Sequence, residues 1–249
     1  MTPIILIPAR MAAVRLPGKP LADIGGTPMI VRVWRAAMEA NLGPVAVAAG
    51  DEEIAEAIRA AGGQAVLTDP ALPSGTDRVL AALRAADPEM RCDVVVNLQG
   101  DMPFIDPSAP RICVGVLDRH PESDIATLVS PEESPADRTN PDVVKAILAM
   151  DPDGAGGRAL YFTRSSLWGE GPVWRHMGLY AYRRAALKRF CAAPPSPLEK
   201  REKLEQLRAM EMGMEIRAAV TPDSPLSVDN PADLAKAREQ ASALAGARP

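Results

Sequence analysis

The sequence predicts an α/β protein built on a doubly wound, mostly parallel sheet with an inserted antiparallel hairpin section. In the first half of the chain, short apolar runs alternate with segments of helical periodicity, which is typical of parallel sheets. Residues 93–101 show almost no polar alternation, as expected of a strand covered on both faces. Residues 142–166 instead hold two strand-like runs around a Pro/Gly/Asp turn, which indicates a hairpin.

The elements of the first half follow from the apolar runs and the residues at their ends. Thr27 is expected to cap the first helix, because Pro28 suits a first helical turn and Gly43 follows the apolar periodicity. The third helix opens with capping residues, and Thr76 is its expected cap. Strands and helices are expected in alternation at 4–7, 27–43, 44–50, 51–63, 64–69, 74–86 and 93–101.

The second half departs from this alternation. After the hairpin we expect an aromatic strand, a helix, a strand and a capped final helix, at 175–184, 196–213, 215–220 and 230–245. The Pro-rich pieces at 131–141 and 194–197 are short enough to be connections rather than domain linkers. No internal repeat is visible, so a single domain over residues 1–249 is expected.

Composition narrows the class of protein. The chain has 249 residues, 47% of them hydrophobic, and a net charge of -4, so it can bury a substantial core. This weak negative charge does not favour nucleic acid or an anionic membrane as partner. The apolar run at 4–7 is too short for a secretory signal or a membrane helix. Because Cys92, Cys113 and Cys191 are odd in number and widely spaced, we expect a cytoplasmic protein without a zinc or disulfide framework.

Three cations follow the first strand, in the stretch ILIPARMAAVRLPGKPL at residues 5–21. Arg10, Arg15 and Lys19 lie among prolines and glycine that exclude a regular helix. Ligands of doubly wound sheets bind outside the carboxyl ends of the strands, where backbone N–H groups, Arg and Lys can hold phosphates. The stretch therefore predicts a polyphosphate site, although it lacks the P-loop pattern. A solvated turn with scattered charges is the alternative.

Two aspartates are candidate metal ligands. Asp101 follows a buried strand in NLQGDMP, where a carboxylate could hold Mg²⁺ against phosphate oxygens or simply cap a turn. Asp229, in LSVDNPADL, is better explained as a turn residue when it is taken alone. The hydroxyls of SGTDR at 74–78 and its Arg78 could begin a helix or contact a base.

The other polar motifs are ordinary when each is taken alone. A lone histidine in a strand, such as His176 in RHMGLYAY, is more often structural than catalytic. The segment LEQLR at 204–208 is typical of a solvated helix face.

Together these blocks resemble the 3-deoxy-manno-octulosonate (Kdo) cytidylyltransferases, also called CMP-Kdo synthetases. The resemblance runs from about residue 4 to 240. The first block is also similar to CMP-sialic acid synthetases, whereas RHMGLYAYR together with PLEKREKLEQLR favours the Kdo branch. The blocks, in family order, are IPARMAAVRLPGKPL, SGTDR, VNLQGDMP, NPDVVKAI, ALYFTRS, RHMGLYAYR, SPLEKREKLEQLR and VDNPADL.

The resemblance implies a Mg²⁺-dependent transfer of CMP from CTP to the anomeric hydroxyl of Kdo, with release of pyrophosphate. The product, CMP-Kdo, would serve lipopolysaccharide biosynthesis. The implied nucleotide-binding residues are Arg10, Arg15, Lys19, Ser74 and Arg78, with Arg10, Lys19 and Asp101 in catalytic roles and Asp101 and Asp229 at the metal. The implied sugar-binding residues are Gln99, Arg164, His176, Tyr180, Glu205 and Gln206, with Arg164 facing the Kdo carboxylate.

The resemblance also divides the single domain. It implies a nucleotide-binding part at about 1–130, a sugar-binding and dimerisation part at about 131–225, and a C-terminal return to the main sheet at about 226–249. Residues 142–184 would then build a homodimer interface. From the residues alone, the same region could equally be a lid over the sugar.

Three positions depart from the family pattern, and they keep other functions open. Ala13 and Val14 replace hydroxyl side chains in the phosphate loop, and Met102 replaces a carboxylate beside Asp101. The alternatives are a cytidylyltransferase for an 8-amino Kdo analogue or a sialic acid, and a nucleotide-sugar-binding protein without catalysis. A glycosyltransferase is disfavoured, because GDMP does not supply the usual DxD metal motif.

Overall fold

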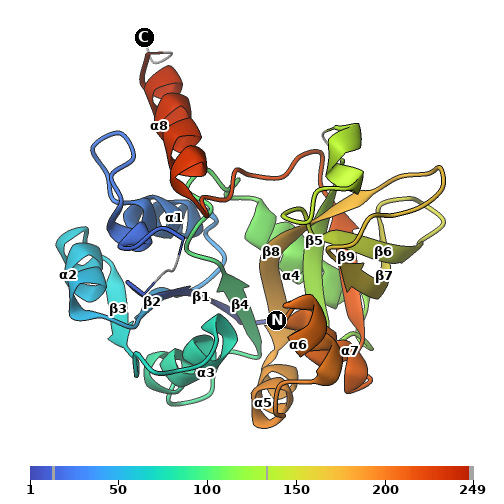
Figure 1. Ribbon diagram of the computed structural model, residues 1–249. Helices are drawn as coiled ribbons and strands as arrows, with labels where there is room; N and C mark the ends of the chain where they lie inside the picture. Colours follow the sequence, from blue (N-terminus) through green and yellow to red (C-terminus); the bar gives the residue numbers. More distant parts are fainter. Residues whose placement is uncertain (13–14, 133, 247–249) are drawn as a thin grey trace. The chain divides into compact units, whose positions relative to one another are not determined.

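The computed structural model describes residues 1–12, 15–132 and 134–246. Its chain forms two compact units, coloured along the sequence in Figure 1. The N-terminal unit comprises Thr2–Cys92, Asn97–Ala109 and the chain from Pro225 onward. The barrel unit comprises Met1, Asp93–Val96 and Pro110–Ser224. Strand β4 (Val94–Leu98) therefore contributes residues to both units.

The N-terminal unit is a parallel α/β layer structure. Its strands β1 (Pro3–Ala9), β2 (Val45–Ala49) and β3 (Gln64–Leu67) lie in the order β3-β2-β1, with β4 next to β1. The β1–β2 and β2–β3 pairs are parallel, and every residue of β1 and β2 is buried. These strands read as continuous apolar runs because both sheet faces are covered.

Helices connect and cover these strands. Figure 1 shows α1 and α3 on opposite sides of β1 and β2. The final helix packs Leu234, Ala237 and Ala241 against Ile24 and Met29, which anchors the C-terminal return in this unit. The helical elements here are η1 (Lys19–Leu21), α1 (Met29–Glu39), α2 (Glu52–Ala60), α3 (Gly75–Ala86) and α8 (Pro231–Gly246).

In the barrel unit five strands close on themselves. They follow the order β8-β5-β9-β7-β6, and β6 pairs again with β8. The β5–β9 pair is parallel, whereas β5–β8, β6–β7, β6–β8 and β7–β9 are antiparallel. The strands are β5 (Ile125–Pro131), β6 (Lys145–Met150), β7 (Gly156–Thr163), β8 (Trp174–Arg183) and β9 (Ile216–Val220).

The α/β class and the hairpin are confirmed, but the sheet is more mixed than predicted. The hairpin at 142–166 is the β6–β7 pair, and it belongs to a small barrel rather than to an insertion in a parallel sheet. Closure into a barrel gives these edge strands hydrogen-bond partners that a short hairpin alone would lack. The sequence analysis gave no bounds for α4 (Ala109–Arg119), and it missed η2 (Pro135–Arg138), α5 (Arg184–Ala192) and β5.

The predicted helix at 196–213 is wrong as a single element. It forms two helices, α6 (Pro197–Glu202) and α7 (Gln206–Glu211). Lys203 adopts a left-handed conformation with φ of 58°, which ends α6 and lets buried Leu204 turn inward. Ser196 caps α6 with a complete capping box, in which Glu199 reaches back to the backbone of Ser196.

Two predicted helix caps are also corrected. Pro28, rather than Thr27, occupies the N-cap of α1, because the Thr27 carbonyl accepts a hydrogen bond from Ile24 in the preceding turn. Ser74, rather than Thr76, caps α3 and accepts from the backbone N–H of Asp77. Thr76 is instead buried within α3.

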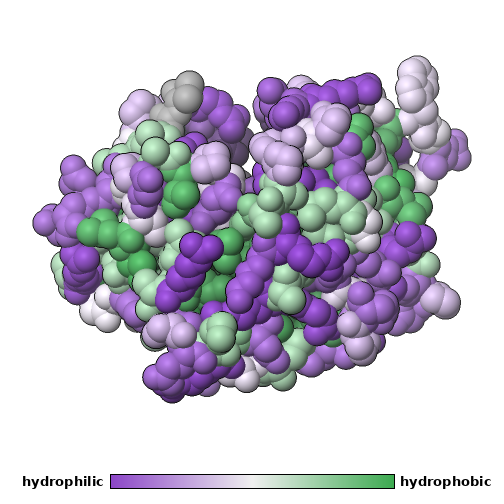
Figure 2. All heavy atoms as spheres, turned by 90° about the horizontal axis from the view of Figure 1, so that it is seen from below, coloured by the Kyte–Doolittle hydropathy of each residue, from purple (hydrophilic) through white to green (hydrophobic). Residues whose placement is uncertain are grey.

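None of the helices in the described residues is long and apolar enough to cross a membrane. On the face that Figure 2 presents, hydrophobic residues form patches that hydrophilic residues separate.

Candidate active site

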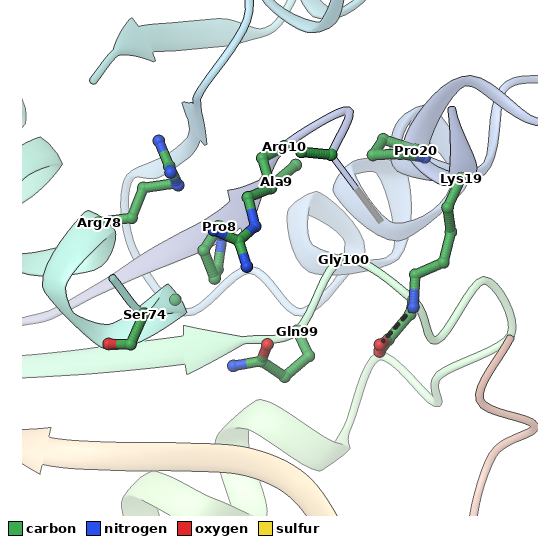
Figure 3. Close-up of a pocket in the computed structure, with 12 residues that line it drawn as sticks. Pro8, Ala9, Arg10, Lys19, Pro20, Ser74, Arg78, Gln99 and Gly100 are labelled. Carbon is green, nitrogen blue, oxygen red and sulfur yellow. Dashed lines mark hydrogen bonds and ion pairs between the residues drawn. The ribbon is translucent and has the colours of Figure 1, made fainter. Parts of the chain in front are cut away.

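A pocket of about 320 Å³ lies within the N-terminal unit, beyond the ends of β1 and β4 (Figure 3). Ligand pockets commonly measure roughly 300–1,000 Å³, so its size suits a small molecule. The pocket is lined by residues that sequence analysis assigned to the site, namely Arg10, Lys19, Ser74, Arg78, Gln99 and Asp101.

Parallel strands explain why these residues meet. Arg10 follows β1, and Gln99 and Asp101 follow β4, so their positions lie at the carboxyl edge of the sheet. Gly50 follows β2 at the same edge. A Cβ on Gly50 would lie 2.8 Å from Nη1 of Arg78 and 3.1 Å from Cβ of Arg10. The absence of a side chain at residue 50 therefore lets both arginines reach the pocket.

The ammonium of Lys19 joins the two predicted metal ligands. Its Nζ lies 3.0 Å from Oδ2 of Asp101 and 3.1 Å from Oδ1 of Asp229, and a dashed line in Figure 3 marks the Asp101 contact. Arg15 adds a second cation, with Nη2 3.3 Å from the same Asp229 oxygen. Burial opposes the charge on Lys19, but the two carboxylates outweigh it and raise the pKa of Lys19 above its ordinary value.

A backbone contact brings Asp229 to Asp101 from far along the chain. The N–H of Val228 donates to the carbonyl of Asp101 at 2.9 Å. The turn before α8 is held by other side chains, because Asn230 accepts from the N–H of Asp233 and Asp233 accepts from the N–H of Asp229. Asp229 thus belongs to the turn through its backbone N–H, while its carboxylate pairs with the cations. Its role as a metal ligand stays a prediction.

Ser74 and Arg78 have structural partners of their own. The hydroxyl of Ser74 donates to Oδ2 of Asp77 at 2.8 Å while it caps α3. The buried guanidinium of Arg78 donates to the hydroxyl of Thr68 at 2.6 Å and to the carbonyl of Asp69 at 3.1 Å. Figure 3 shows this guanidinium directed away from Gln99. Burial and the nearby Arg10 lower the pKa of Arg78. Ser74 and Arg78 both line the pocket. Their contact with a nucleotide stays a prediction.

The donor set at Lys19 fits Mg²⁺. This ion commonly binds one or two protein carboxylates together with substrate phosphates and waters. Asp101 and Asp229 supply two carboxylate oxygens that already converge on one cation. Among the described residues no group of three His, Cys, Asp or Glu side chains could hold a metal by itself. The pair therefore suits an ion that phosphate oxygens help to bind.

Five of the six predicted sugar-binding residues lie in the barrel unit. Gln99 lies in the N-terminal unit, so its grouping with the other five stays a prediction. The ring of His176 packs against Phe162 and Tyr180, with centroids 4.9 and 5.3 Å apart, and its Nε2 lies 3.0 Å from the hydroxyl of Thr127. Burial lowers the pKa of His176 to about 3, so the ring is neutral at physiological pH.

Glu205, at the α6–α7 junction, lies near enough to Tyr180 for its charge to act on the phenol. Burial and, to a lesser extent, the charge of Glu205 raise the pKa of Tyr180, so its phenol stays protonated. The side chain of Gln206 is buried at 5% exposure, and its Nε2 has no hydrogen-bond acceptor among the described residues. A buried amide donor without an acceptor is costly unless a ligand supplies one. Four of the five residues of LEQLR are buried, which contradicts the solvated helix face expected from this segment alone.

Comparisons with known proteins agree with this geometry. A model of the family described as cytidylyltransferase matches residues 4–216. A 3-deoxy-manno-octulosonate cytidylyltransferase of Parvibaculum lavamentivorans is 59% identical over 237 residues, which cover 95% of this chain and 91% of that protein. One of Rhodospirillum centenum is 57% identical over 99% of this chain and 96% of that protein. The chain belongs to the CMP-Kdo synthetase family.

A solved structure extends the likeness to the fold. It is described as CMP:2-keto-3-deoxy-manno-octonic acid synthetase complexed with CTP, and it matches with a TM-score of 0.89 and 35% identity. The match covers 98% of this chain and 100% of that one. The small barrel and the N-terminal unit therefore both belong to the architecture that this chain shares with a CMP-Kdo synthetase.

Two of the three departures from the family pattern lie outside the described residues, namely Ala13 and Val14. Met102 is buried, and the N–H of Ile105 donates to its carbonyl. Its side chain therefore belongs to the apolar core in this member of the CMP-Kdo synthetase family.

Sequence analysis missed a polar relay behind Gln99. Nε2 of Gln99 donates to Oδ1 of Asn97 at 2.9 Å, and Nδ2 of Asn97 donates to the hydroxyl of Thr76 at 3.2 Å. Asn97 and Thr76 are buried, so this relay fixes the amide of Gln99 at the pocket wall. The signal was available, because Asn97 interrupts the otherwise apolar run of β4.

Proposed function

We propose that this chain transfers CMP from CTP to Kdo, which releases pyrophosphate and gives CMP-Kdo for lipopolysaccharide biosynthesis. The observation that carries the proposal is the convergence of Lys19, Asp101 and Asp229 beside a pocket that Arg10 lines. Relatives that are more than half identical carry the name of this activity, and a solved structure of the same fold is described as a complex with CTP.

Arg10, Arg15 and Lys19 would bind the triphosphate. Positive charge aimed at the departing pyrophosphate stabilises the transition state of phosphoryl and nucleotidyl transfer. Asp101 and Asp229 would hold Mg²⁺. The chemistry that such an ion supplies when bound is neutralisation of charge on the phosphate oxygens and a lower pKa of the attacking hydroxyl. Ser74 and Arg78 would flank the cytosine and ribose, as walls of the same pocket.

The barrel unit would bind the sugar acid. Arg164 is suited to the Kdo carboxylate, because its guanidinium can form paired hydrogen bonds with a carboxylate. The buried Nε2 of Gln206 would donate to a sugar hydroxyl and so gain the acceptor that the described residues do not provide. His176, Tyr180 and Glu205 would shape this site. The assignment of Gln99 to the sugar rests on the family resemblance alone, because Gln99 belongs to the N-terminal unit.

We also propose a homodimer that uses residues 142–184. Trp168 is 97% exposed, and Leu160 and Met150 of the β6–β7 hairpin are also exposed, so this segment offers apolar side chains to a second copy. Light scattering of the wild type and of Leu160→Glu at low concentration tests this. A monomeric wild type would contradict it.

We place the reaction in the cytoplasm, where CTP is available.

The experiment that tests the function is a pyrophosphate-release assay with CTP, Kdo and Mg²⁺, each omitted in turn. We expect release only when all three are present, and a fall of about 10²-fold or more in Asp101→Asn because a charge at the reacting phosphates is lost. Asp118→Asn, on the exposed side of α4, is the matched control and should keep wild-type turnover.

Each outcome has a distinct meaning. If the wild type released no pyrophosphate, the proposed reaction would be refuted. Turnover of a sialic acid or an 8-amino analogue in place of Kdo would reassign its substrate. Release that survives in Asp101→Asn would keep the reaction and refute the assigned role of Asp101. Tight CTP binding without turnover would instead favour a nucleotide-sugar-binding protein.

A further inference from the structure

A fully buried lysine begins strand β6 of the barrel unit. Lys145 has 0% exposure, and its backbone pairs with Thr163 of β7 and with Arg175 of β8. It therefore lies where β6 joins two neighbouring strands and closes the barrel. No role for Lys145 follows from the proposed chemistry at the phosphates.

All three N–H groups of this ammonium are used by backbone carbonyls. Nζ of Lys145 donates to the carbonyls of Asn140 at 2.8 Å, Val143 at 3.0 Å and Arg164 at 2.9 Å. An ammonium has three donors, so none is left to contact a ligand directly. Any effect of Lys145 on a substrate must therefore act through its neighbours or through its charge.

These contacts position the side chain of Arg164 in two ways. Lys145 fixes the backbone of Arg164 at the end of β7 and, at the same time, the 140–143 segment. The guanidinium of Arg164 then donates to the carbonyl of Pro141 in that segment, with Nη1 2.9 Å from the oxygen. Lys145 thus sets both the origin of the Arg164 side chain and the acceptor against which its guanidinium rests.

A charged residue at this position needs an explanation beyond packing. Burial of an ammonium is costly in general, and an apolar side chain of similar length would avoid this cost. Neutral carbonyls satisfy its hydrogen bonds but cancel none of its charge. Burial and the nearby Arg164 lower the pKa of Lys145, and Asp137 offsets this only in part. Two cations are therefore kept close together, an arrangement that favours an anion.

We propose that Lys145 is a positioning residue for recognition of the sugar acid's carboxylate. It orients Arg164 and adds positive potential where that carboxylate binds. This inference rests on the proposed function and on the role of Arg164 within it. It adds that the preference for an acidic sugar depends on a buried charge behind the contacting arginine.

The test compares Lys145→Met with wild type in the pyrophosphate-release assay. Met keeps the length of the side chain and removes the charge. We expect the KM for Kdo to rise by about 10- to 100-fold, because a misplaced Arg164 no longer meets the carboxylate in the right geometry, while kcat and the KM for CTP change by less than about threefold. Lys188→Met, on the exposed side of α5, is the control and should match wild type.

Two further measurements separate positioning from general damage to the fold. Lys145→Met should add little to the KM for Kdo in an Arg164→Met background, because both changes act on one interaction. A Kdo amide, which lacks the negative charge, should have nearly the same KM in wild type and in Lys145→Met. The inference would be overturned if Lys145→Met raised the KM for Kdo and the KM for the Kdo amide equally, or if its effect were fully additive with that of Arg164→Met.

A second variant covers the case in which Lys145→Met does not fold. Lys145→Gln removes the charge but keeps an amide that can donate to the carbonyls around it, and it should show the same selective rise in the KM for Kdo. An unchanged KM for Kdo in a folded Lys145→Gln would refute the inference. Loss of Kdo-dependent release in the wild type would instead refute the proposed function.

Discussion

Replacement of Lys19 by methionine should make the stability of the protein respond to Mg²⁺. In the wild type one ammonium satisfies the carboxylates of Asp101 and Asp229, at 3.0 and 3.1 Å. Lys19→Met removes this cation and leaves two negative charges close together, with Arg15 as the remaining partner of Asp229. Because like charges repel, the variant should be less stable and should bind a divalent cation more readily.

The size of the effect follows from the exposure of the three groups. The side chains of Lys19, Asp101 and Asp229 are 17%, 22% and 40% exposed. The bare attraction at about 3 Å would be roughly 5 kcal/mol for each pair at an effective dielectric constant of 20. Water screening and the desolvation of the ammonium reduce measured values for such pairs to about 1 kcal/mol. We therefore expect Lys19→Met to lower the free energy of unfolding by about 1–2 kcal/mol.

Thermal unfolding with and without Mg²⁺ measures this directly. A loss of about 1 kcal/mol lowers Tm by roughly 2–4 °C in a domain of this size. Mg²⁺ should restore most of that loss in Lys19→Met and change the wild type much less. In the pyrophosphate-release assay the same variant should lose about 10²- to 10³-fold in kcat, because one cation facing the leaving group is gone.

The double variant Lys19→Met/Asp229→Asn is the control. It removes one of the two carboxylates, so the added Mg²⁺ response should disappear. If Mg²⁺ stabilised the wild type, Lys19→Met and the double variant equally, the two aspartates would not form the cation site. An unchanged Tm in Lys19→Met would mean that the ion pairs contribute nothing to stability.

Three other predictions concern packing, backbone approach and pH. Arg208→Met should cost about 3 kcal/mol, because it leaves the carboxylate of Glu199 without its partner at 2.6 Å, as urea unfolding would measure. Gly50→Ala should cost about 1–3 kcal/mol and weaken CTP binding, because its Cβ would lie 2.8 Å from Nη1 of Arg78. Burial lowers the pKa of His176 to about 3, so between about pH 6.5 and 3 the unfolded chain binds one more proton than the folded chain. The free energy of unfolding therefore decreases as the pH is lowered through this range. His176→Phe should reduce that slope by about 1.4 kcal/mol per pH unit in urea unfolding.

Matched variants set the scale for these changes. Arg201→Met removes a 3.8 Å contact with Glu202 from an arginine that is 78% exposed, and it should cost under about 0.5 kcal/mol. An equal loss in Arg208→Met would therefore contradict the buried-pair argument. Gly115→Ala in α4 meets no atom closer than 3.4 Å and should be neutral or stabilising. An unchanged acid slope in His176→Phe would show that another group takes up the proton.

Local patterns were sufficient for the N-terminal unit but not for the barrel. The strands there are continuous apolar runs between capped helices, so each is visible in a short window of sequence. The barrel instead depends on pairings such as Ile125 with Ile216, whose partners lie far apart in the chain. Such pairing leaves no local signature, because the same alternating run could pair with any neighbouring strand. The break at Lys203 was hidden for a similar reason, since lysine rarely adopts a left-handed conformation.

The candidate site was predictable where function depends on charge at strand ends. Arg10 and Asp101 were found because charges are unusual directly after buried strands, and Lys19 because it is one of three cations in the loop after the first strand. Arg164, Glu205 and Gln206 came only from the family resemblance, since each is ordinary in its own segment. Thr68 and Asn97 were missed because they contact other polar side chains rather than any predicted ligand. Their roles become visible only when the fold gives each its neighbour.

The cluster of Lys19, Asp101 and Asp229 combines predicted site residues with contacts that the sequence did not reveal. Lys19 was assigned to phosphate and Asp101 and Asp229 to metal, yet in the chain alone they bind one another. If the assignments hold, Lys19 would bind phosphate oxygens, and Asp101 and Asp229 would hold Mg²⁺, whose charge would stand in for that of the ammonium. Arg15, Lys19, Asp101 and Asp229 already compensate one another's charge without a nucleotide, so these four residues can be stable before a highly charged ligand binds.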